Sequence, residues 1–460
     1  MSERVATLIA GALLVTMDAR RRILTDGAIA IRDDKIVAVG KTGELRARFQ
    51  ADQLIDASRF VVTPGFVDAH IHITGDPLTR GYIPDDIDAG FEEKLTRWVI
   101  PRFVSQTPEE ERLSAQLAAV QMLRSGTTCF LEAGTIRQLD AVVDGLKSCG
   151  IRARVGAWVE GRAADPAREA AATDTAIRVL EEEVRRYPAA ADQLIAACPI
   201  LIGHTTNSDA VWQAASRLAE AHDLPVSAHM SPFRTDADWY LEHLGRRPIE
   251  HLAHIGVLGP HLALTHLAHI DDNEQALLEQ SGASGIYCPM SALKGAFGIS
   301  KDGRFPELRA AGVNIALGTD GDLPDLMQKM SLVAALFKDA REDPRVFPAQ
   351  DALEMATLGG ARVLRLQDQI GSLEAGRKAD LVLHDTDRPE WQPLLNPLHQ
   401  LVWSADGRSV HSVFVGGVRV VDNYRCTLID EESIYAQAAE AARALLQRSR
   451  VPNVCAWPIE

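Results

Sequence analysis

Between residue 60 and about residue 319, the 460-residue chain alternates short apolar segments with longer amphipathic ones. The short segments, typical of buried β-strands, are residues 61–67, 127–131, 153–158, 195–202, 225–228, 262–265, 285–287 and 313–317. Segments with apolar residues three to four positions apart, typical of helices, lie between them at 108–124, 139–148, 167–186, 209–222 and 272–280. Eight strands with intervening helices predict an α/β fold, a (β/α)8 TIM barrel.

Further β-rich segments lie on both sides of the predicted barrel. Residues 5–17, 27–32 and 35–40 precede it, and residues 379–384, 410–415 and 418–421 follow it. A fold that brings the two groups together makes a small composite β-sandwich domain from both termini. We therefore predict residues 1–59 and 367–430 for the sandwich, 60–366 for the barrel, and 431–460 for a C-terminal helix and tail.

The overall charge and the cysteines narrow the class of protein. A formal net charge of −15 argues against a nucleic-acid partner, because phosphate contacts need a concentrated basic surface. The apolar run 5–17 is too short to span a membrane, so no membrane partner is expected. None of the six cysteines forms a C-x-x-C pair and their spacing is irregular, which favours a reduced, cytoplasmic location.

The end of the first predicted barrel strand carries a His-x-His pair. Alternate side chains of a strand share a face, so Asp68, His70 and His72 are expected to point the same way. They fall at the C-terminal end of the strand, where barrel enzymes place their catalytic groups. Two imidazoles there suit a metal ion such as zinc, whereas two surface histidines in a loop are the alternative.

Three other strand ends favour the metal site. The fifth strand ends at His229, the sixth at His266, and the eighth is followed by Asp320. One polar group at a strand end is common because loops begin there. An imidazole or carboxylate after each of three further strands, combined with the His-x-His pair, is much harder to obtain by chance.

Several stretches of sequence make the chain resemble the amidohydrolase superfamily, in its cytosine deaminase-like and chlorohydrolase-like branch. The matching text is TPGFVDAHIH at 63–72, SGTT at 125–128, CPMS at 288–291, GTDG at 318–321 and GSLEAGRKADL at 371–381. The resemblance implies that the metal ligands are His70, His72, His229 and Asp320. It also implies that His266 contacts the substrate and the metal-bound water. The strand-four region offers no lysine of the kind that bridges two metals in other members, which implies one ion.

That ligand set predicts the chemistry of the site. Three neutral imidazoles and a carboxylate leave room for water on one divalent ion, whose charge lowers the pKa of that water to about 7. Zinc is expected, and iron, cobalt or manganese fit the same geometry. Asp320 can accept the proton of the attacking water and pass it to the leaving nitrogen. His266 is expected to stabilise charge on the substrate as the second catalytic residue.

Two positions depart from the pattern of the deaminases in this branch. The glutamate usually found three residues after the strand-five histidine is Pro232, and the asparagine usually found after the serine of CPMS is Ala292. A proline cannot move a proton to a ring nitrogen. We therefore predict hydrolysis of a non-peptide C–N bond of amide, carbamate, thiocarbamate or urea type in a small molecule.

Two alternatives stay open at this point. Within enzymes, the alternative is a deaminase or dechlorinase of a nitrogen heterocycle such as a purine, pterin, pyrimidine or s-triazine. The alternative of another class is a metal-free relative that acts as a binding or assembly protein, although all five core residues are intact. The resemblance also implies a homo-oligomer, a dimer or larger.

The candidates for substrate binding are weaker, and each has a structural alternative. Glu132, at the end of the second strand, is either a substitute carboxylate or, as the structural alternative, a solvated loop residue or a partner for a barrel arginine. His204 and Ser291 fall at strand ends, and His269 follows His266 by three residues and can orient it. Trp98 lies with Phe103 in the long segment after the first strand, where the rings either wall the substrate pocket or form core.

Overall fold

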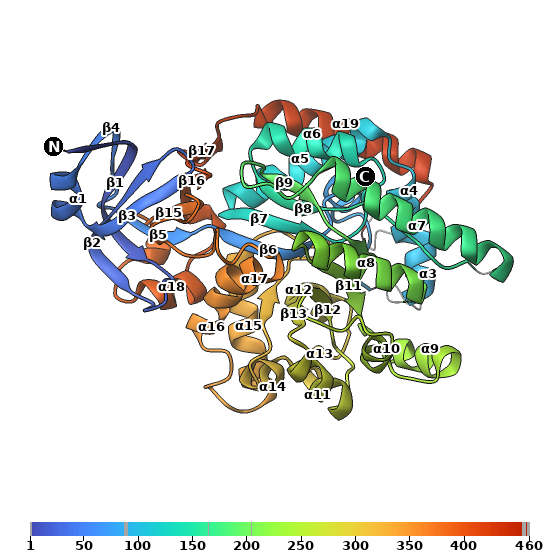
Figure 1. The fold of residues 1–460 in the computed structure, drawn as a ribbon. Coiled ribbons are helices and arrows are strands. Elements are labelled where there is room, and N and C mark those ends of the chain that lie inside the picture. Colours follow the sequence, from blue (N-terminus) through green and yellow to red (C-terminus); the bar gives the residue numbers. More distant parts are fainter. Residues whose placement is uncertain (1, 87–90, 164, 204, 453–456, 458–460) are drawn as a thin grey trace.

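The barrel strands form two parallel sheets, and their helices lie outside them (Figure 1). The computed structural model describes residues 2–86, 91–163, 165–203, 205–452 and 457. One sheet has the order β6-β7-β8-β9 and the other β10-β11-β12-β13-β14. Their bounds are β6 (Phe66–Ile71), β7 (Thr127–Glu132), β8 (Arg152–Val155), β9 (Ile195–Ala197), β10 (Ile200–Leu201), β11 (Val226–Met230), β12 (Leu262–His266), β13 (Ser284–Tyr287) and β14 (Ile315–Leu317).

Short connections close these sheets into the predicted (β/α)8 barrel. The pair β9 and β10 is the predicted fourth strand, divided after Ala197. On the other side, Ile71 and Asp320 form a parallel bridge, and the Asp320 backbone N–H donates to the His70 carbonyl at 2.9 Å. The fold class predicted from the alternation is therefore confirmed.

The helices fall where the apolar spacing predicts them. They are α5 (Pro108–Arg124), α6 (Leu139–Cys149), α7 (Pro166–Arg186), α8 (Asp209–His222) and α11 (Asp272–Ser281), whereas α15 (Leu326–Ala340) lies outside the predicted segments. The start of α5 is set by Thr107, whose hydroxyl accepts from the Glu110 N–H while the Glu110 carboxylate accepts from the Thr107 N–H. In α6, Val142, Val143 and Leu146 are buried in the core beneath the sheet.

Both ends of the chain build the second domain. Its nine strands are β1 (Glu3–Val15), β2 (Ile23–Arg32), β3 (Lys35–Lys41), β4 (Phe49–Asp56), β5 (Phe60–Pro64), β15 (Leu381–Asp385), β16 (Val410–Val415), β17 (Val418–Asp422) and β18 (Arg425–Cys426). Figure 1 shows the blue and orange strands side by side. Alternate residues of β1 enter different cores, Ile9 one and Leu8 the other, as in a β-sandwich.

One predicted strand is two strands in the structure. Residues 61–67 divide into β5, which pairs with β1 and β15, and β6, which pairs with β7. Gly65 separates them, and a Cβ there would lie 2.0 Å from Thr128 Oγ1, so only glycine allows the chain to pass this close to the next barrel strand. By its pairing, β5 belongs to the composite sheet, although it lies beyond the predicted boundary at residue 59.

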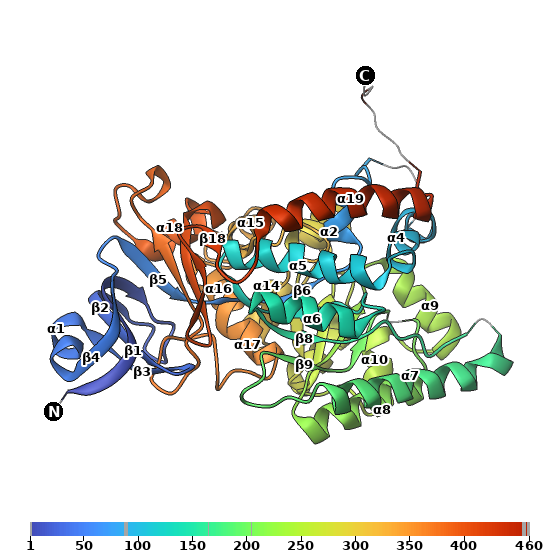
Figure 2. The same ribbon diagram turned by 90° about the horizontal axis from the view of Figure 1, so that it is seen from above.

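The C-terminal helix packs on the barrel. In α19 (Glu431–Ser449), Ile434, Ala438 and Leu445 are buried with Leu113 and Val120 of α5, and the two helices lie side by side in Figure 2. None of the helices in the described part of the chain is both long enough and apolar enough to cross a membrane.

A buried ion pair ties the two domains together. Arg152, the first residue of β8, donates from Nε and Nη2 to the two carboxylate oxygens of Asp380 at 2.9 and 3.0 Å. The Gly416 N–H donates to the same carboxylate at 2.7 Å. The bidentate geometry fixes the orientation of the barrel wall against the composite sheet.

Candidate metal centre

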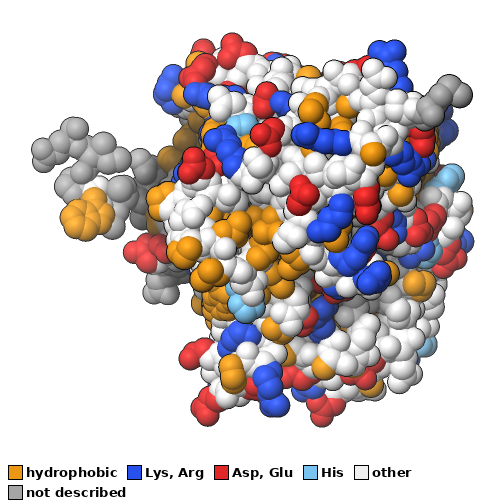
Figure 3. Space-filling view, turned by 90° about the vertical axis from the view of Figure 1, so that its left-hand side faces the viewer, with side chains coloured by type: hydrophobic (Ala, Val, Ile, Leu, Met, Phe, Trp, Pro, Cys, Tyr) orange, Lys and Arg blue, Asp and Glu red, His pale blue; other side chains and the backbone are white. Residues whose placement is uncertain are grey.

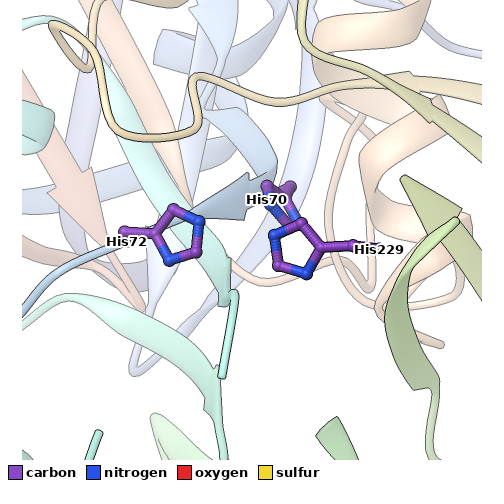
Figure 4. Close-up of side chains that lie close together, drawn as sticks. All are labelled: His70, His72 and His229. Atoms are coloured by element: carbon purple, nitrogen blue, oxygen red, sulfur yellow. The ribbon is translucent and has the colours of Figure 1, made fainter. Parts of the chain in front are cut away.

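Four imidazoles and one carboxylate meet at the C-terminal ends of four barrel strands. The residues are His70, His72, His229, His266 and Asp320, from or directly after β6, β11, β12 and β14. Figure 4 shows His70, His72 and His229 turned toward one another. The ring centroids of His70 and His229 are 4.6 Å apart, and those of His72 and His229 are 5.4 Å apart.

The ligand atoms of this cluster are close enough for one ion. Nitrogen atoms of His70, His72 and His229 lie within 4.8 Å of one another, and so do ligand atoms of His70, His266 and Asp320. Asp320 Oδ1 is 3.2 Å from His72 Nε2, and Asp320 Oδ2 is 3.8 Å from His266 Nε2. Imidazole and carboxylate donors at this spacing suit a divalent transition metal.

Neighbouring groups orient two of the imidazoles. The Nδ1 of His229 contacts the Ile202 carbonyl, and the Nδ1 of His70 lies 3.0 Å from Thr265 Oγ1. Because Nδ1 donates to the carbonyl in His229, the lone pair is on Nε2. His70 Nε2 and His72 Nδ1 are buried and have no hydrogen-bond partner among the described residues. Unpaired buried nitrogens of this kind are what a bound ion would satisfy.

Asp68 supports the cluster from behind and lies outside both ligand groups. Its carboxylate accepts from the N–H groups of His70 and Thr319 at 3.2 and 3.1 Å and from the Thr319 hydroxyl at 2.5 Å. Irregular pairing between β6 and β7 around residues 68–71 breaks the alternation that predicted a shared face. Burial raises the pKa of Asp68 to about 7 despite these hydrogen bonds.

The backbone at the strand ends is shaped to present these side chains. His266 has φ 83° and Asp320 has φ 58°, and Ser231, two residues after His229, has φ 50°. Non-glycine residues in this region carry backbone strain, which concentrates at functional sites. Gly318 allows β14 to approach, because a Cβ there would lie 2.8 Å from both His70 Cβ and Cys288 Sγ.

The electrostatics favour neutral His70 and His229 beside an ionised Asp320. Burial, reinforced by the neighbouring imidazoles, lowers the pKa of His70 and His229 well below the ordinary value. Burial opposes the ionised form of Asp320, but the hydrogen bond and charge of His72 outweigh it and hold the Asp320 pKa well below its usual range. Burial opposes the charged form of His72, but the hydrogen bond and charge of Asp320 outweigh it and raise the His72 pKa. Neutral imidazole and carboxylate are the forms that bind metals.

Aromatic rings flank the cluster on two sides. The ring of Phe103, in α4 (Ile100–Val104), lies 6.2 Å from the His72 ring and 6.2 Å from Trp158. On the other side, Phe297 lies 5.3 Å from the His266 ring and 4.8 Å from Phe233. The sequence does not single out Trp158 or Phe233. The strand predicted at 153–158 ends at Val155 in the structure, and both rings lie in irregular segments after their strands.

Glu132, the last residue of β7, is held in place by hydrogen bonds from the loop that follows it. Its oxygens accept from the Gly134 and Thr135 N–H groups at 2.6 and 3.0 Å and from the Thr135 hydroxyl at 2.7 Å. It is fully buried, and burial raises its pKa. The predicted alternative of a solvated loop residue is therefore wrong, since the carboxylate is buried inside a tight turn.

The remaining candidates for substrate binding lie outside both ligand groups or outside the described residues. His269 lines a surface cavity of about 740 Å³ together with Arg234 and Asp302, with its Nδ1 3.9 Å from Asp302 Oδ2. The Ser291 hydroxyl donates to the Cys288 carbonyl at 3.3 Å. Trp98 is buried under the Arg97 guanidinium, and it is Phe103 that contacts His72. His204 falls outside the described residues.

A barrel with five such residues at its strand ends is typical of a class of metal-dependent hydrolases. Comparison with known proteins identifies the family to which the chain belongs. The profile of the amidohydrolase family matches residues 61–420. A second profile, the bacterial imidazolonepropionase-like composite domain, matches residues 27–49. The chain belongs to the amidohydrolase family.

Relatives in sequence and structure agree with this assignment. A 5-methylthioadenosine/S-adenosylhomocysteine deaminase of Syntrophobacter fumaroxidans is 32% identical, over 96% of this chain and 99% of its own. A zinc-bound adenosine deaminase from Xanthomonas campestris superposes with a TM-score of 0.86 at 29% identity, covering 97% of this chain and 100% of its own. A zinc complex of atrazine chlorohydrolase from Arthrobacter aurescens, at 22% identity, superposes with a TM-score of 0.84 over 95% of this chain and all of its own, and shows the shared fold.

Family and site together fix the kind of reaction. The protein is a metal-dependent hydrolase that acts on carbon–nitrogen bonds other than peptide bonds. The predictions of the family, the fold class and the enzyme class are confirmed. The alternative of a metal-free binding or assembly protein has no support, because the metal-binding cluster is complete.

Proposed function

We propose that His70, His72, His229 and Asp320 bind one divalent ion, and that this ion is zinc. The unpaired nitrogens of His70 and His72, the lowered pKa values of His70 and His229 and the ionised Asp320 support this ligand set. Zinc accepts three imidazoles and a carboxylate while leaving a position open, and iron, cobalt and manganese are the alternatives. A bound ion supplies Lewis acidity and lowers the pKa of water.

The proposed reaction is hydrolysis of a C–N bond at the carbonyl-type carbon of a small amide, carbamate, thiocarbamate or urea. The main support for this reaction is Pro232, a buried side chain without an ionisable group. It stands at the position where deaminases of this branch usually have a glutamate. Glu132, the substitute proposed from the sequence, already accepts three hydrogen bonds from its own loop. A carbonyl substrate needs no ring nitrogen protonated, so the missing glutamate does not block its hydrolysis.

Different residues of the chain have different roles in the proposed reaction. Asp320 is ionised and can accept a proton from the attacking water, then deliver it to the departing nitrogen. His266, whose Nε2 lies 3.8 Å from Asp320 Oδ2, is placed to donate a hydrogen bond to the substrate oxygen as charge develops on it. Thr265 and the Ile202 carbonyl hold the rings of His70 and His229 in place.

A second candidate is deamination of a purine-type ring. It is supported by the relatives named as 5-methylthioadenosine/S-adenosylhomocysteine deaminases, which match over nearly the whole chain. In that case a group other than residue 232 must protonate the ring nitrogen. Asp322 can hold such a proton, because burial and the charge of Asp320 raise its pKa, although Lys294 at 3.4 Å opposes the rise.

One experiment separates the two candidates. The purified protein is stripped with a chelator, reloaded with zinc, and incubated with paired sets of aryl and alkyl amides, carbamates and ureas and of purine nucleosides. Mass spectrometry of the products distinguishes release of an amine from release of ammonia. We expect zinc-dependent amine release, and efficient ammonia release from a purine with none from the carbonyl compounds would overturn the proposal.

We extend the proposal to a homo-oligomer, a dimer or larger. The face in Figure 3 gathers hydrophobic side chains between charged ones. In the segment between β15 and β16, Leu395 is 84% exposed and Trp403, at the end of α18 (Pro397–Trp403), is 47% exposed. Sedimentation of the purified protein measures the oligomeric state. A cytoplasmic location stays a prediction.

A further inference from the structure

The ring of Phe297 is held over the candidate metal centre by an otherwise exposed loop. Phe297 lies between α12 (Pro289–Lys294) and α13 (Ile299–Asp302), and its neighbours Ala296 and Gly298 are exposed. Phe297 itself turns inward, with its ring 5.3 Å from that of His266 at an interplanar angle of 85°. Phe297 is therefore a large apolar side chain of an exposed loop that contacts the proposed catalytic histidine. From this position its ring can contact a bound substrate.

Contacts at both ends keep the loop in this position. The Phe297 N–H donates to the Ala292 carbonyl at 2.9 Å, and the Phe297 ring packs on Phe233. On the far side, Asp302 pairs with Arg234 of α9 (Arg234–Leu244), which anchors α13 to the rim of the barrel. The Phe297 ring is therefore a fixed part of the site wall.

A second aromatic wall faces the other side of the histidine cluster. Phe103 lies 6.2 Å from the His72 ring, and Trp158 lies against Phe103 at 6.2 Å. His72 and His266 are both within 5.4 Å of His229, so the two walls border the same cluster from different strands. Each wall therefore offers a flat ligand an aromatic ring to pack against.

We propose that Phe297 is a specificity-determining residue that selects substrates with a planar aromatic ring next to the scissile C–N bond. The ring of the substrate lies between Phe297 and Phe103, with the bond to be broken above the histidine cluster. This inference rests on the proposed function for the bond that is cleaved, but ring selection is a property of binding alone. Aromatic pairs favour a planar ring over a saturated one of similar size by about threefold to tenfold.

The test uses two compounds that differ only in the ring. Isothermal titration of the zinc-loaded protein measures the Kd of N,N-dimethyl-N′-phenylurea and of N,N-dimethyl-N′-cyclohexylurea. The variants are Phe297→Leu, which removes the ring, and Phe297→Tyr, which keeps it. The control is Leu293→Ala, a change at a 39% exposed residue of the preceding helix.

We expect wild type, Phe297→Tyr and Leu293→Ala to bind the phenyl compound about fivefold more tightly, and Phe297→Leu to bind the two compounds within twofold of each other. Equal Kd values in wild type, no binding of either compound, or an unchanged preference in Phe297→Leu would overturn the inference. Hydrolysis of the same compounds is measured separately. Ring-selective binding that depends on Phe297, without hydrolysis, contradicts the proposed reaction and leaves the specificity assignment standing.

Discussion

Two buried polar clusters of the molecule are built in opposite ways. At the junction of the domains, Asp380 accepts three hydrogen bonds, two from Arg152 and one from the Gly416 N–H. At the mouth of the barrel, His70 and His72 keep buried nitrogens that have no partner among the described residues. The polar atoms of the first cluster find their hydrogen-bond partners within the chain, whereas the buried nitrogens of the second can still bind a further group.

The difference shows that some buried polar groups stabilise the fold, whereas others are available for binding and catalysis. A paired charge such as Arg152 keeps its ionised form in spite of burial, because the charge of Asp380 outweighs the desolvation and raises its pKa. The imidazoles of His70 and His229 are instead held neutral, chiefly by burial, so they can donate lone pairs. Changes at the junction should therefore affect stability, whereas changes at the mouth should affect activity.

The largest effect is expected at Asp320. Asp320→Asn keeps the shape of the side chain but removes the carboxylate that we propose binds the metal and moves protons. We expect kcat to fall about 10³- to 10⁴-fold with little change in Tm, measured by steady-state kinetics and calorimetry. Asp368→Asn, at a carboxylate that is 89% exposed, is the matched control. An Asp320→Asn enzyme with wild-type kcat and metal content would contradict the assignment.

A large loss of stability is expected at the junction. Asp380→Ala leaves the buried Arg152 without its partner, which should lower the free energy of unfolding by about 3–5 kcal/mol. Urea unfolding measures this, and the kcat of the folded fraction should stay within about twofold of wild type. The double variant Arg152→Leu/Asp380→Leu should recover part of the loss, because no unpaired charge is left. A loss equal to that of the single variant would argue against this explanation.

The smallest effect is expected at His384, a buried group of the composite sheet that carries no charge. Its Nε2 lies 3.1 Å from Thr63 Oγ1, and burial lowers its pKa to about 3. The unfolded chain binds a proton below about pH 6.5, so the stability from neutral His384 is present above that pH and is lost as the pH falls toward 3. Between pH 7 and pH 5 the loss is about 2 kcal/mol.

His384→Gln removes this titration. Urea unfolding at both pH values gives the difference between wild type and variant, which cancels other groups such as Glu111 and Glu183, whose pKa values burial raises to about 7. The variant should gain about 2 kcal/mol relative to wild type as the pH falls from 7 to 5. A difference that does not change with pH would show that His384 is not buried in its neutral form.

The sequence predicts the barrel and the five core residues because both depend on local patterns. Strand alternation and helical spacing set the elements, and a polar residue at a strand end lies at the barrel mouth in any barrel. Trp158 and Phe233 could not be predicted in the same way, since their contacts with Phe103 and Phe297 depend on how loops from different strands meet.

Two further errors have a physical origin of the same kind. The division of residues 61–67 at Gly65 follows from a close contact with Thr128, a residue 63 positions away that strand periodicity does not reveal. For Glu132, only the alternative of a solvated loop residue is wrong. Its burial and its hydrogen bonds to Gly134 and Thr135 depend on a turn whose shape the sequence pattern did not indicate.

The composite sheet has a consequence for the order in which the chain folds. On one side, β5 pairs with β1, which is made before it, but its other neighbour is β15, and Thr63 and His384 are 321 residues apart. During synthesis from the N-terminus, one edge of β5 therefore has no native partner until the whole barrel has been made. An unpaired edge can join other chains, so a ribosome-bound or truncated protein ending before residue 381 should be the form most prone to aggregate.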